Sequence, residues 1–207
     1  LARQHAAALE HFERRGWDAV TVALPCFDPP GAGIERSHAA IVAVYDKLGL
    51  DSHGRVLRGA TGYLEAPDAP RDSEAVQHLI AAALATPADG PPLYVVAIGC
   101  ATNVASALLR APQIAERIVV VWTSGYPSHA PQPNASFNLE QDLLAAQVLL
   151  DSGVPHVYLP GFHVGAQLRL SLPEMERHVQ PCGAIGAELH RLYRDANPLR
   201  DLAGLDP

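Results

Sequence analysis

The sequence predicts an α/β protein built on an open, mostly parallel, doubly wound sheet with helices on both faces. Short apolar runs alternate along the chain with longer segments of helical spacing, which is the pattern of β-α-β units. The runs are nearly continuous in apolar residues, which is typical of strands buried on both faces. The chain has 207 residues, 48% of them hydrophobic and 18% charged, so it can form one sizeable core. We therefore expect one domain over residues 1–207.

Each expected strand is an apolar run that ends at a turn signal. The run 93–98 stops at Gly99, and the run 118–122 is the most β-branched of the chain. Loops rich in proline and glycine follow the first two strands, at 25–33 and 59–70. The expected strands cover 17–24, 55–57, 93–98, 118–122 and 154–159.

The expected helices carry apolar residues at helical spacing between recognisable start and stop signals. Gly16 ends the first helix, Asp72 or Ser73 caps the third, and Pro112 closes the fourth. The expected helices cover 4–15, 34–48, the stripe 76–84, 102–109, 139–150, 172–179 and 184–196.

Composition and charge exclude several classes of protein. A formal net charge of −7 without a basic cluster argues against a nucleic-acid or anionic-membrane partner. No apolar run reaches the roughly 20 residues of a membrane span. The cysteines, Cys26, Cys100 and Cys182, show no CxxC spacing, so we expect reduced thiols in a cytoplasmic protein. The sequence also contains no P-loop, GxSxG or HExxH motif.

One segment, 92–103, reads PLYVVAIGCATN and leads a buried strand through a tight turn into a helix. Ligands bind at the carboxyl ends of strands in open α/β sheets, which is where Thr102 and Asn103 fall. Thr102 also suits a helix N-cap, and Asn138 begins a variant of the capping box. Both positions lie at helix starts beside strand ends, so a cap and a ligand contact are compatible interpretations.

Two segments resemble motifs of the inosine-uridine preferring nucleoside hydrolases. The stretch 99–105, GCATNVA, is similar to the family's G-P-L-T-N-[IL]-A segment. The stretch 135–145, in which ASFN precedes Asp142 and Ala145, is similar to A-E-F-N…D…A. The resemblance extends over roughly residues 4–170, which is most of the chain.

The resemblance implies a nucleoside hydrolase-like α/β fold and cleavage of the N-glycosidic bond of ribonucleosides by dimers or tetramers. Members of the family hold a calcium ion with aspartates of an N-terminal D-x-D-x-x-x-D-D signature, a main-chain carbonyl at the Thr of the T-N motif and a C-terminal Asp. Calcium prefers such oxygen ligands. The residues that the resemblance places around a nucleoside or sugar-like ligand are Thr102, Asn103, Ser136, Phe137 and Asn138.

The acidic signature itself is not matched. Ala2 and Arg3 align with two of its aspartates, and Ser136 replaces the Glu of A-E-F-N. An arginine stays protonated and repels a cation, so we expect no metal site from these residues. We expect calcium only if the signature lies before Leu1, where the first strand of the fold would also lie. A C-terminal part of the fold is likewise expected beyond Pro207.

Three hypotheses about function follow. In the first, which we favour, the protein is an N-glycosidase in which Asp28 and His163 replace the missing acidic groups. In the second, a degenerate homologue binds a ligand or partner without calcium-dependent hydrolysis. In the third, the chemistry is altered and Arg3 binds an anionic group of the substrate, for which its planar fork is suited. Asp28 also suits a turn before Pro29, and His163 a solvated loop.

Overall fold

The computed structural model describes residues 21–23, 30–131 and 133–195, which form two compact units. The larger unit comprises residues 21–41 and 56–168, and the smaller one contains 42–55 and 169–195 of the described residues. The expected helix 4–15, most of the expected strand 17–24, and the candidate residues Arg3 and Asp28 lie outside the described residues.

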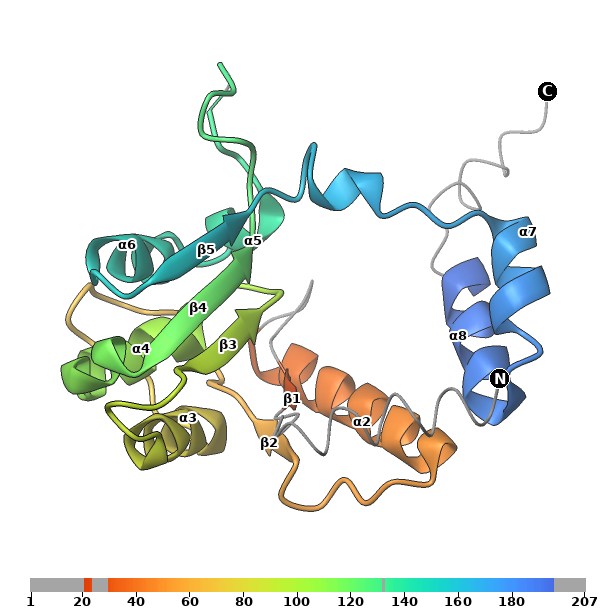
Figure 1. The fold of residues 1–207 in the computed structure, drawn as a ribbon, viewed down its shortest axis with the longest axis horizontal. Helices are drawn as coiled ribbons and strands as arrows, with labels where there is room; N and C mark the ends of the chain where they lie inside the picture. Colours follow the sequence, from red (N-terminus) through yellow and green to blue (C-terminus); the bar gives the residue numbers. More distant parts are fainter. Residues whose placement is uncertain (1–20, 24–29, 132, 196–207) are drawn as a thin grey trace. The chain divides into compact units, whose positions relative to one another are not determined.

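The strands of the larger unit form two parallel sheets. In the first, β1 (Thr21–Ala23) pairs with β2 (Val56–Arg58). In the second, β4 (Ile118–Thr123) lies between β3 (Leu93–Ala97) and β5 (His156–Leu159), as Figure 1 shows. Every described strand pair is parallel, which confirms the predicted α/β fold with a parallel sheet.

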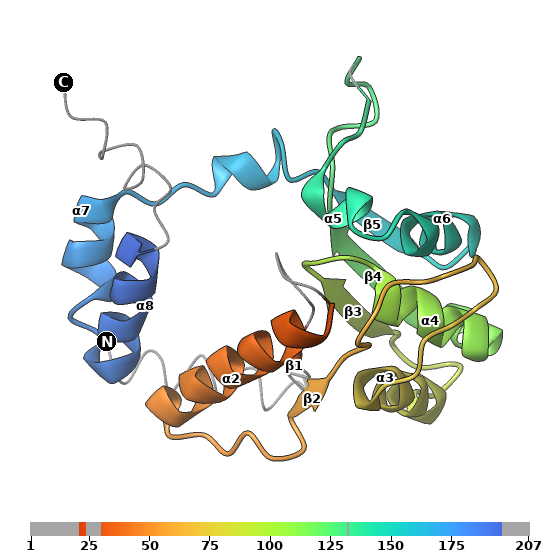
Figure 2. The same cartoon turned by 180° about the vertical axis from the view of Figure 1, so that it is seen from behind.

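Helices of the larger unit pack on one face of the sheet formed by β3, β4 and β5. α4 (Thr102–Arg110) packs between α3 (Glu74–Ala85) and α6 (Leu143–Asp151), and Figures 1 and 2 both show the three side by side. Their buried residues share one hydrophobic core with alternate residues of β4. α4 and α6 occupy the same face because successive right-handed crossovers from β3 to β4 to β5 run in one direction.

The prediction that the strands are buried on both faces is wrong for β3. Tyr94 and Val96 are 63% and 67% exposed, whereas Ala97 is buried. Successive side chains of a strand point to opposite faces, and among the described residues α3, α4 and α6 cover only one of them. The apolar run was therefore misleading about the environment of its alternate residues.

Two predicted boundaries also change. The helix predicted at 34–48 is α2 (Pro30–Leu48), so its first turn includes part of the predicted loop 25–33. Proline is well tolerated in a first helical turn, where its missing N–H costs nothing. The helix predicted at 139–150 is divided into α5 (Phe137–Glu140) and α6, because Asp142 leaves the helical conformation and caps α6.

The smaller unit includes a short helical hairpin. α7 (Leu172–Glu174) continues into a π-helical turn, Met175–Val179, and α8 (Gly183–Asp195) follows. Ser171 caps α7 and forms a capping box with Glu174. No helix among the described residues is long and apolar enough to cross a membrane.

Candidate functional site

The turn between β3 and α4 places Thr102 in a buried position. Thr102 is 2% exposed, and its hydroxyl donates to Oδ2 of Asp142 at 2.5 Å. The interpretation of Thr102 as an N-cap is wrong, because Ala101 occupies that position without a side-chain cap. Thr102 is the first residue of the helix, and its hydroxyl is directed to another segment of the chain instead of to its own helix.

Asp142 joins three segments through one carboxylate. Besides the Thr102 hydroxyl, its oxygens accept the backbone N–H of Leu64 at 3.1 Å and that of Ala145 at 3.0 Å. The residue is only 3% exposed. The carboxylate thus ties the loop after β2 and the start of α4 to the first turn of α6.

Asn103 connects α4 to the loop after β2 and to the N-cap of α3. Its Oδ1 accepts the N–H of Ala60 at 2.9 Å and lies 3.4 Å from the hydroxyl of Ser73. The side chain is 5% exposed, and its Nδ2 has no hydrogen-bond partner among the described residues. A buried amide donor without an acceptor is costly, so this atom requires a partner that the described residues do not supply.

The loop from Gly59 to Arg71 is attached to α4 at a further point. Ser106 Oγ accepts the N–H of Arg71 at 3.0 Å, and Arg71 Nε donates to the carbonyl of Tyr63 at 2.6 Å. Together with the bonds at Ala60 and Leu64, these contacts hold a long irregular segment against α4 and the start of α6. Ordered loops of this length are commonly functional.

Asn138 ties the ends of β3 and β4 together. Its Nδ2 donates to the carbonyls of Ile98 at 3.1 Å and Thr123 at 2.9 Å. The interpretation of Asn138 as a helix cap is wrong, because Ser136 is the N-cap of α5 and makes no side-chain cap bond. The buried Ser136 hydroxyl instead pairs with that of Ser124 at 2.9 Å.

The carboxyl edge therefore brings together most of the described candidates. Thr102 and Asn103 follow β3, while Ser136 and Asn138 lie beside the end of β4, and Phe137 between them is 45% exposed. His163 follows β5 in an exposed loop with φ of 72°, an uncommon conformation for a residue other than glycine. No described contact joins His163 to Thr102 or Asn103.

Sequence reasoning missed two features of this region. Asp142 appeared only within the resemblance, although an acidic residue directly before an apolar helix is a signal for a cap. Tyr126 stacks on Phe162 with ring centroids 4.2 Å apart, which joins the loop after β4 to the loop after β5. Stacking between distant loops has no periodic signal in a sequence.

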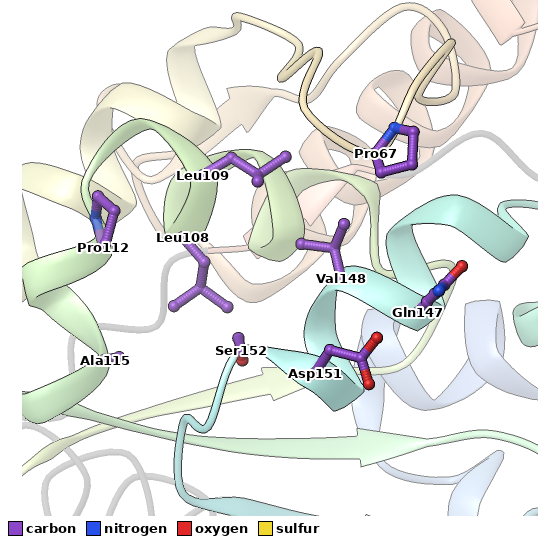
Figure 3. A pocket seen from close by; sticks show the side chains of 9 residues that line it. All are labelled: Pro67, Leu108, Leu109, Pro112, Ala115, Gln147, Val148, Asp151 and Ser152. Carbon is purple, nitrogen blue, oxygen red and sulfur yellow. The ribbon is translucent and has the colours of Figure 1, made fainter.

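Two hollows of the larger unit lie apart from Thr102, Asn103 and Asn138. The one drawn in Figure 3, about 410 Å³ in volume, lies between α4 and α6 and is mainly apolar. The other, about 420 Å³, is lined by Trp122, His156 and Tyr158 beside the loop after β4. Burial lowers the pKa of His156, and its Nε2 has no partner among the described residues. Neither hollow includes Thr102, Asn103 or Asn138.

The described residues do not fit a calcium site. They contain no group of three or more His, Cys, Asp or Glu side chains that could hold a metal ion. Calcium takes six to eight oxygen ligands. Asp142, the acidic residue at the start of α6, already directs its oxygens to three protein donors.

Comparisons with known proteins agree with this architecture. A purine-preferring ribonucleoside hydrolase from Gardnerella vaginalis aligns at 22% identity with a TM-score of 0.57, over 79% of this chain and 62% of that one. The effector protein XOO4466 aligns at 18% identity with a TM-score of 0.65, over 95% of this chain and 63% of that one. At such identities these likenesses show the fold alone.

The sequence comparisons establish the family. An uncharacterised protein of Schizosaccharomyces pombe is 31% identical over 118 residues, which are 50% of this chain and 38% of that protein. The chain thus spans about two fifths of this relative. The family model described as inosine-uridine preferring nucleoside hydrolase matches residues 20–202, nearly the whole chain. The Thr102–Asn103 turn, the Asn138 bridge and the parallel sheet thus belong to a member of the inosine-uridine preferring nucleoside hydrolase family.

Proposed function

We propose that this chain binds a ribonucleoside or a related ribosyl compound at the carboxyl ends of β3 and β4 and cleaves its N-glycosidic bond. The observation that carries the proposal is the buried Asn103 amide, whose Nδ2 lacks an acceptor among the described residues. A sugar hydroxyl can accept a hydrogen bond from such an amide. Membership of the family supports the reaction class.

The binding groups have complementary roles in this proposal. Asn103 offers a donor at the start of α4, and the exposed ring of Phe137 offers an apolar surface beside the end of β4. The amide hydrogens of Asn138 are already donated to two strand-end carbonyls, so its role is to fix the two strand ends relative to each other. Asp28 and His163 stay candidates for the acid–base groups that hydrolysis needs.

Turnover of inosine, uridine and p-nitrophenyl riboside tests the reaction directly. We expect release of base or nitrophenol above the uncatalysed rate. Asn103→Asp keeps an oxygen acceptor for Ala60 but removes the amide donor, so it should weaken substrate binding about tenfold. Gln113→Glu, the same amide-to-acid change at an exposed position after α4, is the matched control. A wild-type protein that releases neither base nor nitrophenol would rule out the hydrolase.

A second candidate function is binding of the same class of ligand without calcium-dependent hydrolysis. The observation that favours it is the absence of a metal-ligating cluster from the described residues, together with the engagement of Asp142 by protein donors. Thermal unfolding with and without calcium separates the two functions, because a ligand bound to the native state raises the melting temperature. Stabilisation by inosine but not by calcium, without turnover, would favour the second function.

A further inference from the structure

We infer that Asp142 is the positioning residue of this site, and that it holds the start of α4 and the loop after β2 in one fixed arrangement. The inference rests on the proposed function, since it gives Asp142 a role at the same ligand site. Asp142 acts through Thr102 and Leu64, which its carboxylate contacts. It does not itself touch the ligand in this assignment.

Capping alone does not explain the surroundings of Asp142. A cap needs one side-chain oxygen, and Oδ1 of Asp142 fills that role with the N–H of Ala145. The exposed Ser171 achieves the same at α7. Oδ2, by contrast, accepts from Thr102 and from Leu64, which lie 40 and 78 residues away in the sequence.

The burial of Asp142 points in the same direction. Removing a carboxylate from water is expensive unless hydrogen bonds compensate for the lost hydration. None of the ion pairs among the described residues includes Asp142, so neutral donors compensate its charge. A buried carboxylate whose hydrogen bonds are satisfied makes its surroundings rigid and favours a single geometry.

The geometry that results concerns the ligand site directly. Thr102 precedes Asn103, so fixing the Thr102 hydroxyl also fixes the first turn of α4 from which the Asn103 amide projects. The Leu64 bond and the Ala60 bond to Asn103 hold the loop segment between them at two points. Loss of the Asp142 contacts should therefore loosen the Asn103 donor and this loop segment together.

Three variants separate positioning from capping and from packing. Asp142→Asn keeps a good N-cap but turns an amide N–H toward donors, so it removes the acceptor that Leu64 uses. Thr102→Val removes the hydroxyl while keeping the shape, and Thr102→Ser keeps the hydroxyl. Thr86→Val is the matched control, because it also removes one hydroxyl hydrogen bond, the one to the carbonyl of Ala82. Both residues lie at the C-terminal end of α3, whereas Asn103 contacts Ser73 at the N-terminal end.

The measurements are the KM and kcat for nucleoside cleavage and the hydrogen exchange of the Leu64 amide. We expect Asp142→Asn and Thr102→Val to raise KM about tenfold and to speed Leu64 exchange, with a smaller change in kcat. Thr102→Ser should stay close to the wild type in both, and Thr86→Val should lower stability alone. A Thr102→Val protein with wild-type KM and Leu64 exchange would overturn the inference.

Failure of the proposed function would be visible separately. If the wild type neither binds nor cleaves the three ribosides (inosine, uridine and p-nitrophenyl riboside), the ligand site is refuted, and with it the positioning role toward a ligand. The exchange data then still report whether Asp142 holds the loop. If the wild type is active but Asp142→Asn behaves like Thr86→Val, only the role of Asp142 is refuted.

Discussion

Single polar side chains fix the carboxyl ends of neighbouring strands in the larger unit. Asn138 donates to the Ile98 carbonyl, just after β3, and to the Thr123 carbonyl, at the end of β4. The indole of Trp122 donates to the Gly99 carbonyl at 2.8 Å. These carbonyls lie where strand pairing stops, so side chains must satisfy them. The turn between β3 and α4 is therefore held from two directions.

Replacing Asn138 with Asp should destabilise the larger unit in a pH-dependent way. At neutral pH a carboxylate would face the carbonyls of Ile98 and Thr123, whereas the protonated acid could still donate to one of them. The loss of unfolding free energy, about 1–3 kcal/mol at pH 7, should shrink as the pH falls toward 4. Urea denaturation at both pH values checks it, and an equal loss at both would contradict it.

His156 gives the wild type a pH dependence of its own. Burial lowers the pKa of its imidazole, so the folded state favours the neutral ring. Histidine in an unfolded chain has a pKa of about 6.5. Below that pH the unfolded chain binds a proton at His156 more readily than the folded state does. Stability should therefore fall as the pH drops below about 6.5. His156→Phe should flatten the dependence of unfolding free energy on pH between 7 and 5, and an unchanged slope would argue against it.

At the scale of elements, glycine decides how closely α8 approaches the π-helical turn. A Cβ at Gly186 would overlap the carbonyl oxygen of Val179 and lie 2.9 Å from Cβ of Cys182. Gly183 is a useful contrast, because its φ is +72° but a Cβ there would meet nothing within 4 Å. Close packing therefore requires glycine at position 186, whereas backbone conformation favours glycine at position 183.

Gly186→Ala should lower the unfolding free energy of the smaller unit by about 2–3 kcal/mol, since a backbone carbonyl has to move. Gly183→Ala should lower the unfolding free energy by about 1 kcal/mol, because only the left-handed backbone conformation disfavours a side chain there. Urea denaturation followed by circular dichroism measures both variants. Equal losses would mean that α8 does not pack on Val179 as described.

At the scale of the whole molecule, the face of β3 that α3, α4 and α6 leave uncovered is apolar. Tyr94, Val96 and Ile98 are 63%, 67% and 76% exposed. Contiguous exposed apolar residues are unusual on soluble monomers and bind hydrophobic dyes. The double variant Val96→Thr, Ile98→Thr should therefore reduce dye fluorescence.

The same double variant should change the unfolding free energy by less than about 1 kcal/mol, because both side chains are already exposed. The matched control is Val120→Thr in β4, a fully buried position, where an unpaired hydroxyl should cost about 1–3 kcal/mol. Unchanged dye binding in the double variant would show that this face is covered in solution.

Much of the fold follows from the sequence because strands and helices have periodic patterns. The strands at 93–98 and 118–122 and the helix at 102–109 lie within one residue of their predicted ends. The division of 139–150 was not predictable from its apolar spacing, since the break lies at Asp142, whose carboxylate caps α6 and also accepts from Thr102 and Leu64, far away in the sequence. Likewise, the exposure of Val96 depends on which face the helices cover.

The sequence predicts where the candidate site lies better than it predicts which residues contact one another there. The position of Thr102 and Asn103 after a strand follows from the rule for open sheets. The actual partners of these side chains, Asp142 and the Ala60 N–H, come from other elements and depend on how those elements pack. The hydrogen bonds that replace the expected caps were therefore beyond the reach of local patterns.

The attachment of the 59–71 loop has a consequence for how the family can diversify. Ala60, Leu64 and Arg71 are held through their main-chain N–H groups, which every residue except proline possesses. Selection can therefore replace the side chains between these anchor points without releasing the loop. The segment between the anchor points can thus change in sequence while Asn103, Ser106 and Asp142, the side chains that accept these bonds, stay the same.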